Sequence, residues 1–143
     1  MGDLNLNLAI SPCPNDTFLF ESLVGQVVAA GGTVSFLDIA QLNQLHDAPS
    51  PPDVVKVSCA QAPLFHGRYR LLRCGGAFAR AVGPLVLERA QPTGEGVGLP
   101  GEGTTAHILW RMWSAFQGIQ DPREEFDRFD RLPARLASGD WRR

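Results

Sequence analysis

The opening of the chain changes from a strand pattern to a helix pattern within a few residues. Apolar side chains recur at every second position over residues 4–10, which predicts a β-strand. A helix is expected over residues 16–30, because the apolar residues there share one face: Phe20, Leu23, Val24, Val27 and Val28. Between these elements, two prolines are expected to hold the junction extended up to Asn15, so that Asn15 or Asp16 caps the helix.

Further strands and helices alternate over the next part of the chain. The glycine pair at 31–32 ends the first helix, and Asp38 with Gln41 three residues later forms a capping box. The other elements expected here are a strand at 33–37, a short helix from 38 to about 46, a proline-rich loop at 48–52, a strand at 54–57 and a helix from Ser58. This order of strand, helix and strand predicts an α/β protein with a mainly parallel sheet.

The second half of the chain has fewer clear elements. Residues 70–88 contain the glycines 75–76 and an apolar run at 82–87, which predict strands joined by a sharp turn. Residues 96–100 predict a short strand and a turn. A helix is expected over 104–118, because its apolar residues gather on one face: Ala106, Leu109, Trp110, Trp113 and Phe116.

Three of the predicted strand-to-helix corners carry a serine or a threonine. Ser11, Ser58 and the pair Thr104-Thr105 each lie where a helix is expected to begin. Unpaired backbone N–H groups and the helix dipole favour an anion at such a position. Serine and threonine are also common helix caps without any ligand, so each corner alone is open to either interpretation. The three together favour a shared cleft that binds a carboxylate or a polyhydroxylated ligand.

Composition and charge narrow the class of protein. Hydrophobic residues make up 44% and charged residues 20% of the chain, which allows a packed core. The formal net charge of −2 argues against a nucleic-acid-binding surface. No apolar run reaches the roughly 18 residues that a membrane span needs, and the first residues lack the pattern of a signal peptide. A cytoplasmic protein without a membrane or nucleic-acid partner is therefore expected.

Neither the cysteines nor the histidines have the spacing of a metal site. The three cysteines form no CxxC pair, and Cys13 and Cys59 are most simply interpreted as small buried residues beside a cleft. The three histidines share no metal-ligand spacing. His107 follows the threonine pair closely, but at helical spacing it is expected to point away from that pair.

Five stretches of the chain together resemble one known family. They occur in the family's order, with similar spacing, and cover nearly the whole chain: SPCPNDTFLF (11–20), KVSCA (56–60), RCGGAFARAVGPLVLER (73–89), PGEGTTA (100–106) and, more weakly, FDRFDRLPARLASGD (126–140). The SPCPND run and the GG…GPLV block are specific, whereas a TT pair alone is common. On these stretches the chain resembles the 1,4-dihydroxy-6-naphthoate synthases, enzymes of the futalosine route of menaquinone biosynthesis.

The resemblance implies a bilobal fold like that of type II periplasmic binding proteins. Residues 1–88 would form an incomplete first lobe and residues 89–143 would begin the second, with the ligand between the lobes. The resemblance also implies a carbon–carbon lyase, which converts cyclic dehypoxanthinyl futalosine to 1,4-dihydroxy-6-naphthoate and dihydroxyacetone and needs neither a cofactor nor a metal.

The resemblance further implies which residues bind this small-molecule substrate. They are Lys56, Val57 and Ser58 from one lobe and Thr104 and Thr105 from the other, with Ser11 and Asn15 as second candidates. The positive charge of Lys56 suits the substrate carboxylate. The N–H and hydroxyl groups of the threonines suit a carboxylate or sugar-derived hydroxyls. The alternative role of Ser11 and Asn15 is to shape and cap their corner.

The family's catalytic base is a histidine in a His-Glu pair, which by the resemblance follows after residue 140. The sequence reads Trp141-Arg142-Arg143 there and ends, so no catalytic residue is assigned within it. The codons GTG GAG GCG, for a family-like Val-Glu-Ala, read Trp-Arg-Arg when their first base is dropped. A single-base frameshift is therefore one hypothesis, and a natural short protein or a fragment is the other. The chain is expected to be inactive alone.

Two other classes of function stay open. One is a small-anion binding protein of the same bilobal fold that performs no chemistry. The other is a remnant that does not fold stably, because the strand expected after Asp140 would be missing. The helix face with Trp110, Trp113 and Phe116 would then have little to pack against.

Overall fold

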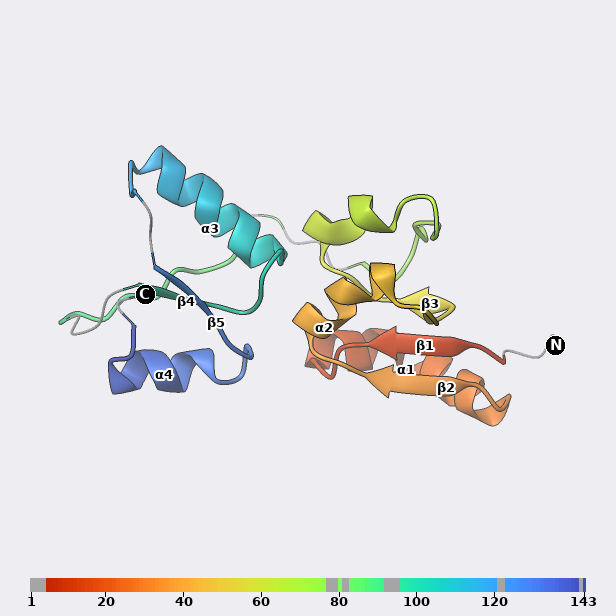
Figure 1. Ribbon diagram of the computed structural model, residues 1–143. Coiled ribbons are helices and arrows are strands. Elements are labelled where there is room, and N and C mark those ends of the chain that lie inside the picture. Colours follow the sequence, from red (N-terminus) through yellow and green to blue (C-terminus); the bar gives the residue numbers. More distant parts are fainter. Residues whose placement is uncertain (1–4, 77–79, 81–82, 92–95, 121–122, 142) are drawn as a thin grey trace. The chain divides into compact units, whose positions relative to one another are not determined.

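The computed structural model describes the chain apart from residues 1–4, 77–79, 81–82, 92–95, 121–122 and 142 (Figure 1). The chain divides into two compact units, residues 1–78 and residues 79–143. Among the described residues, no helix combines the length and the apolar character that crossing a membrane requires. The lobe boundary predicted after residue 88 stays a prediction, because the compact units reflect packing within this chain and not the resembled fold.

The first unit is built around a three-stranded parallel sheet. Its strands, in the spatial order β2-β1-β3, are β1 (Asn7–Ile10), β2 (Thr33–Phe36) and β3 (Val54–Val55) (Figure 1). The three apolar residues of the central strand, 8–10, are each at most 2% exposed. A central strand covered on both faces is typical of parallel sheets. The predicted α/β class and the parallel sheet are thus confirmed, whereas the bilobal arrangement stays a prediction.

The first helix begins earlier than the sequence predicts. Helix α1 (Pro14–Ala29) has Cys13 as its N-cap residue, and the Cys13 side chain makes no capping hydrogen bond. The predicted caps at Asn15 or Asp16 are therefore wrong, and so is the expectation of extended backbone up to Asn15. Pro14 fits the first helical position because the N–H that proline lacks would have no helical partner there.

The remaining helices of the first unit are short. Helix α2 (Ile39–Asn43) confirms the predicted capping box, because Asp38 accepts from the N–H of Gln41 and the Gln41 side chain accepts from the N–H of Asp38. It continues as the 3₁₀ helix η1 (Gln44–Asp47). The helix expected from Ser58 is the 3₁₀ helix η2 (Cys59–Phe65).

The second unit places two helices around a small parallel sheet. Its elements are β4 (Val97–Leu99), α3 (Thr105–Phe116), β5 (Glu124–Phe126) and α4 (Leu132–Ser138). Figure 1 shows α3 and α4 on opposite sides of the two strands. The strand at 96–100 and the helix over 104–118 are confirmed within a residue or two at their ends.

The side chains of β4 alternate between the two faces of its sheet. Val97 and Leu99 are buried together with Trp110 of α3. The opposite face at Gly98 is covered by Trp141, which is 1% exposed. The residue on this strand that faces Trp141 is thus the one that has no side chain.

The segment after Asp140 belongs to the same packing. The backbone N–H of Gly98 donates to the carbonyl of Arg143 at 2.9 Å, and the N–H of Arg143 donates to the carbonyl of Gly96 at 3.4 Å. This is the hydrogen-bond pattern of a parallel neighbour to β4. The apolar face of α3 is covered at Trp110, whereas Phe116 at its end is 86% exposed.

The strands predicted within residues 70–88 are wrong for the part that the structure describes. Residues 70–76, 80 and 83–88 carry no strand, and the other positions of the segment lie outside the described residues. Leu71 and Leu85 are each 84% exposed. An extended segment becomes a stable strand only beside others that take up its backbone groups and its apolar face, and the exposed leucines show that such a face is not covered at residues 71 and 85.

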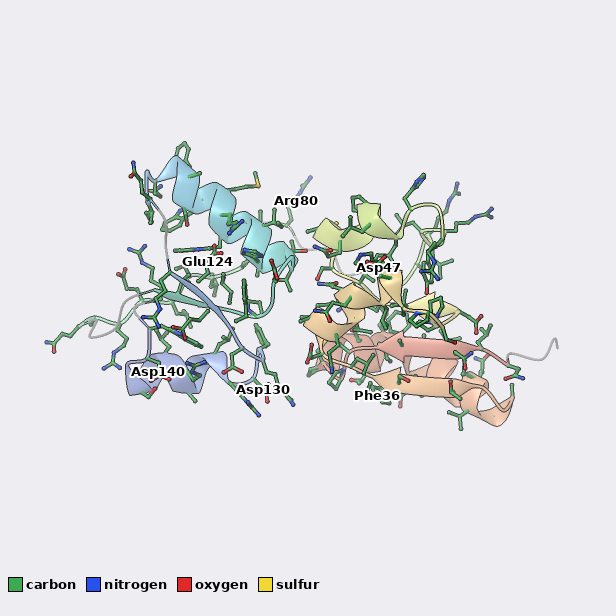
Figure 2. All side chains as sticks on the ribbon, viewed as in Figure 1. Phe36, Asp47, Arg80, Glu124, Asp130 and Asp140 are labelled. Atoms are coloured by element: carbon green, nitrogen blue, oxygen red, sulfur yellow. The ribbon has the colours of Figure 1, made fainter. Side chains whose placement is uncertain are left out.

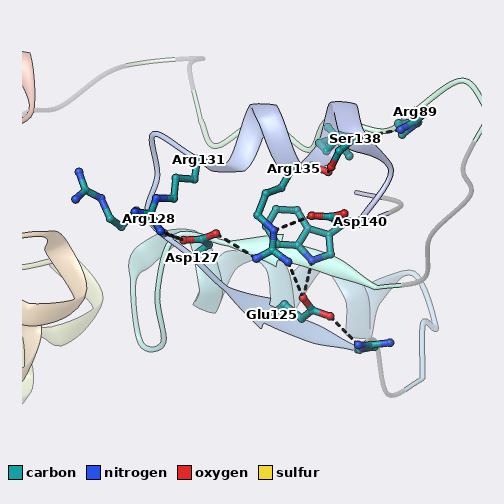
Figure 3. A network of polar contacts seen from close by, with 11 residues as sticks. Arg89, Glu125, Asp127, Arg128, Arg131, Arg135, Ser138 and Asp140 are labelled. Carbon is teal, nitrogen blue, oxygen red and sulfur yellow. Dashed lines mark hydrogen bonds and ion pairs between the residues drawn. The ribbon is translucent and has the colours of Figure 1, made fainter.

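Arg135 of α4 joins the helix to β5 and to Trp141. Its guanidinium donates to Asp140 Oδ2 at 2.9 Å, to Asp127 Oδ2 at 3.1 Å and to Glu125 Oε2 at 3.3 Å (Figure 3). It also lies 4.1 Å from the centroid of the Trp141 ring. Glu125 Oε2 accepts a second bond from the Trp141 indole N–H at 2.9 Å. One arginine thus fixes the indole from its face while a carboxylate fixes it from its edge.

The polar contacts in this network favour ionised carboxylates. The indole N–H of Trp141, followed by nearby arginines, holds the pKa of Glu125 below its ordinary value. The hydrogen bond from Arg135 does the same to the pKa of Asp140. A carboxyl group whose pKa is lowered by folding stabilises the protein above its unfolded pKa, and this stabilisation is lost as the pH falls through the folded pKa.

Replacing Gly98 with alanine is expected to destabilise the second unit. The new Cβ would overlap two ring carbons of Trp141, so the buried indole would have to move. Overpacking of this kind costs typically about 1–3 kcal/mol. All three tryptophans lie in this unit, so tryptophan fluorescence during urea unfolding measures its stability. The control Gly83→Ala places a Cβ with nothing within 4 Å, and equal losses in both variants would contradict the prediction.

The second unit is also expected to lose stability in acid. Its urea midpoint, followed by tryptophan fluorescence, should fall as the pH drops below about 4, the ordinary range for carboxyl groups. Arg135→Met should flatten this pH dependence, because Arg135 pairs with three of the carboxylates. Arg73→Met removes the same charge from an exposed position of the first unit and should keep the wild-type profile. A wild-type midpoint that does not change with pH would refute the role of the network.

Candidate functional site

The predicted site residues of the first unit gather where two parallel strands end. Ser11 directly follows β1, and Lys56 directly follows β3. The backbone N–H of Lys56 still donates to the carbonyl of Ala9 at 2.9 Å, so the two chain segments remain paired there. Because parallel strands end at one edge of their sheet, the fold brings Ser11 and Lys56 to the same edge, which is the usual ligand edge in α/β proteins.

A single carboxylate oxygen joins these two residues. Asp16 Oδ2 accepts from the Ser11 hydroxyl at 2.5 Å and from the Lys56 ammonium at 3.0 Å. The backbone N–H of Ser11 approaches the same oxygen at 3.3 Å. Asp16 is 5% exposed, and the Lys56 side chain is 28% exposed. A buried carboxylate needs such donors to replace its lost water, and the ammonium remains within reach of a ligand.

Sequence reasoning treated Asp16 only as a possible helix cap and missed its place in the site. One available signal was the lysine itself. Lys56 is the single lysine of the chain, beside twelve arginines that complete its 13 basic residues. Lysine is a compact charge with three donors, whereas arginine presents a planar fork. The lysine at position 56 therefore stands out among the basic residues of the chain.

Ser58 is held by a buried amide that the sequence did not identify. The side-chain N–H₂ of Asn43 donates to Ser58 Oγ at 3.0 Å, and Asn43 Oδ1 accepts from the Ser58 N–H at 2.9 Å. Asn43 is 4% and Ser58 is 8% exposed. Ser58 is the N-cap residue of η2, but its side chain makes no capping hydrogen bond. Its oxygen accepts from Asn43, and within the part of the chain that the structure describes its own O–H has no hydrogen-bond acceptor, so it can donate to a ligand.

Other predicted residues of this unit lie nearby in sequence but differ in exposure. Val57 is half-buried between Lys56 and Ser58, and Asn15 is exposed in the first turn of α1. Cys13 is half-buried and Cys59 is exposed. The expectation that both cysteines are buried is therefore wrong. Cys13 is the N-cap residue of α1, and Cys59 is the first residue of η2.

The threonine corner of the second unit is a closed cap. Thr104 is 3% exposed and is the N-cap residue of α3. Its hydroxyl donates to the carbonyl of Gly101 at 2.8 Å and accepts from the N–H of His107 at 3.2 Å. Thr105 follows as the first helical residue and is half-buried. The Thr104 hydroxyl thus serves the backbone, as the cap interpretation expected.

His107 completes this corner from inside the unit. Its Nδ1 accepts from the N–H of Gly103 at 2.9 Å, which places the ring proton on Nε2. Nε2 lies 3.3 Å from Oε2 of Glu124, which is labelled in Figure 2, and the Glu124 carboxylate also binds the guanidinium of Arg111. His107 is 4% exposed. It therefore fixes the turn before Thr104, and its burial does not suit a general base.

The structure groups the predicted residues into two sets. Lys56, Ser58 and Ser11 belong to the first unit, and Thr104 and Thr105 belong to the second, so their union in one site stays a prediction.

Among the described residues, no group of three or more His, Cys, Asp or Glu side chains is placed to hold a metal ion. A hollow of about 460 Å³ in the second unit contains none of the predicted residues; it is lined by Val86, Glu88, Trp113, Gln117, Ile119 and Arg143.

Because its hydroxyl bonds only to the backbone at the start of α3, Thr104 is expected to stabilise the second unit. Thr104→Val is expected to lower the stability of the second unit by about 1 kcal/mol, the usual cost of losing a cap. Thr104→Ser keeps the hydroxyl and should retain most of the stability. Urea unfolding followed by tryptophan fluorescence measures both variants. A valine variant as stable as the serine variant would contradict the role of the two hydroxyl hydrogen bonds.

Two kinds of comparison relate the chain to known proteins. A sequence model of a family described as menaquinone biosynthesis matches residues 6–141. The chain is 44% identical over 115 residues to a 1,4-dihydroxy-6-naphtoate synthase of Streptomyces coelicolor, covering 77% of this chain and 40% of the relative. It is 39% identical over 140 residues to the protein of the same name from Thermus thermophilus, covering 94% of this chain and 49% of the relative.

The chain spans less than half the length of these two curated relatives. The family match, in contrast, extends from the start of the first sheet to Trp141, across both compact units. The predicted resemblance is therefore confirmed, and the chain belongs to the menaquinone-biosynthesis family.

Proposed function

We propose that this chain supplies substrate-binding residues of a 1,4-dihydroxy-6-naphthoate synthase. The reaction is the carbon–carbon lyase step that converts cyclic dehypoxanthinyl futalosine to 1,4-dihydroxy-6-naphthoate and dihydroxyacetone in the cytoplasm. The proposal rests on the names of the relatives. The observation that carries it is the half-buried ammonium of Lys56, held by Asp16 at the ligand edge of the first sheet.

The polar groups at this edge suit a carboxylate. The Ser11 proton is directed to Asp16, but Lys56 has two further N–H donors and Ser58 has its O–H. Donors that meet no acceptor among the described residues favour a ligand that offers oxygens, and a charged donor forms the stronger bond to a carboxylate. The substrate and the naphthoate product both carry one, so both fit the proposed site.

The second unit contributes a helix N-terminus in this proposal. The start of α3 at Thr105 carries the positive end of the helix dipole, which favours the oxygens of the same ligand. The proposed full arrangement is the bilobal, periplasmic-binding-protein-like fold with the ligand between its lobes. The general base is the family's histidine, which by the resemblance lies beyond the present 143 residues.

Binding of 1,4-dihydroxy-6-naphthoate to the purified chain tests this function. Ser58→Ala is expected to weaken binding roughly 10- to 100-fold, since a hydrogen bond to a charged group contributes about 1.5–3 kcal/mol. Ser22→Ala removes an exposed serine hydroxyl on α1 and should bind like wild type. The chain alone should release no dihydroxyacetone from cyclic dehypoxanthinyl futalosine, because loss of a general base costs about 10²–10⁴ in rate.

Two results would refute the proposal. One is a wild-type chain that does not bind the naphthoate, and the other is unchanged binding by the Ser58→Ala variant. Turnover at the rate of a full-length relative would refute the expected inactivity of the chain alone.

A further inference from the structure

We propose that Asp16 is a positioning residue, which aims the ammonium of Lys56 at the carboxylate of the bound ligand. This inference rests on the proposed function and deepens it. Asp16 itself would not touch the ligand. Its task would be to hold Lys56 in one direction, with one N–H directed inward and two directed to the ligand.

The contacts of Asp16 support this task. Its Oδ2 accepts hydrogen bonds from the Ser11 hydroxyl at 2.5 Å, from the Ser11 N–H at 3.3 Å and from the Lys56 ammonium at 3.0 Å. The side chain of Asp16 is 7% exposed, against 28% for that of Lys56. The carboxylate therefore lies on the protein side of the pair, and the ammonium lies on its open side.

The backbone explains how this carboxylate comes to face the strand ends. Asp16 is the third residue of α1, after Pro14 and Asn15. From this position an acidic side chain can reach back past the helix start. Here it reaches Ser11, the residue that follows β1, instead of the N–H of the N-cap residue Cys13, which approaches Ser11 Oγ at 3.4 Å. The positive end of the helix dipole adds to the stability of the carboxylate there.

The geometry also accounts for a lysine at position 56. Asp16 receives Lys56 on the oxygen that the Ser11 hydroxyl already occupies. An ammonium can use one donor at this oxygen and keep two others. A guanidinium prefers two parallel bonds to both carboxylate oxygens, which would direct its fork at Asp16 and away from a ligand. Lys56→Arg is thus not a conservative change here.

Charge and positioning give opposite expectations for the Asp16→Asn variant. This variant removes a negative charge beside Lys56, so simple electrostatics predicts tighter binding of an anion. If Asp16 instead positions Lys56, the Lys56 ammonium is no longer oriented in the variant, and the variant binds the anion more weakly. The sign of the change in affinity therefore separates the two explanations.

The single lysine allows a direct measurement. Incorporation of ¹³C,¹⁵N-lysine gives one side-chain NMR signal, because Lys56 is the chain's one lysine. In the ligand-free wild-type chain this signal should show a restrained side chain. Asp16→Asn should make it mobile and weaken binding of 1,4-dihydroxy-6-naphthoate by about tenfold, the effect of losing a well-directed charged hydrogen bond. The control Asp47→Asn, at a side chain that is 85% exposed, should change neither quantity.

A second variant keeps the proposal open to refutation if Asp16→Asn does not fold. Lys56→Arg retains the charge and should also bind the naphthoate about tenfold more weakly. Wild-type affinity in Lys56→Arg, or an equally restrained lysine and tighter binding in Asp16→Asn, would overturn the positioning role. A wild-type chain that binds no naphthoate while Lys56 is restrained would instead overturn the proposed function, and the ligand-aiming role with it.

Discussion

One buried carboxylate oxygen organises the edge of the first unit's sheet at which β1 and β3 end. Asp16 Oδ2 bonds to Ser11 after β1 and to Lys56 after β3, while its backbone belongs to the first turn of α1. Two strand ends and one helix start are thereby held by one atom. Without these donors a carboxylate that is 5% exposed would be costly. This arrangement explains why Lys56 is only half-exposed, because the buried Asp16 carboxylate holds the Lys56 ammonium against the protein.

The three strand-to-helix corners look alike in sequence but differ in chemistry. Ser11 gives its proton to Asp16, Ser58 accepts from the buried amide of Asn43, and Thr104 bonds to the backbone on both sides. Only the last is a side-chain cap of the ordinary kind. The partner of each hydroxyl decides whether its proton is available to a ligand. Among these three, the Ser58 hydroxyl is the one that donates to no acceptor within the described residues.

Sequence patterns predicted those features that depend on local residues. The strand predicted at 4–10, the Asp38 capping box and the helix at 104–118 follow from spacing and propensity. The structure confirms the capping box, the helix and, over Asn7–Ile10, the strand; residues 5–6 carry no strand, and residue 4 lies outside the described residues. The start of α1 was wrong because Pro14 fits a helix as well as it fits an extended corner. Asp16 and Asn43 were missed because their roles depend on residues 40 and 15 positions away, and no local pattern carries that information.

Gly98 in the second unit is another residue whose role depends on a residue far away in the sequence. Gly98 lies in a predicted strand, but its lack of a side chain acquires meaning only when Trp141 covers it. Around it, Arg135, Glu125 and the closed cap at Thr104 direct their polar groups to one another and to the backbone. At the first sheet edge, in contrast, Lys56 and Ser58 have N–H and O–H groups that bind no acceptor among the residues that the structure describes. In the proposed function, side-chain recognition of a carboxylate is therefore assigned to the first unit, and the helix start of α3 with its dipole is assigned to the second.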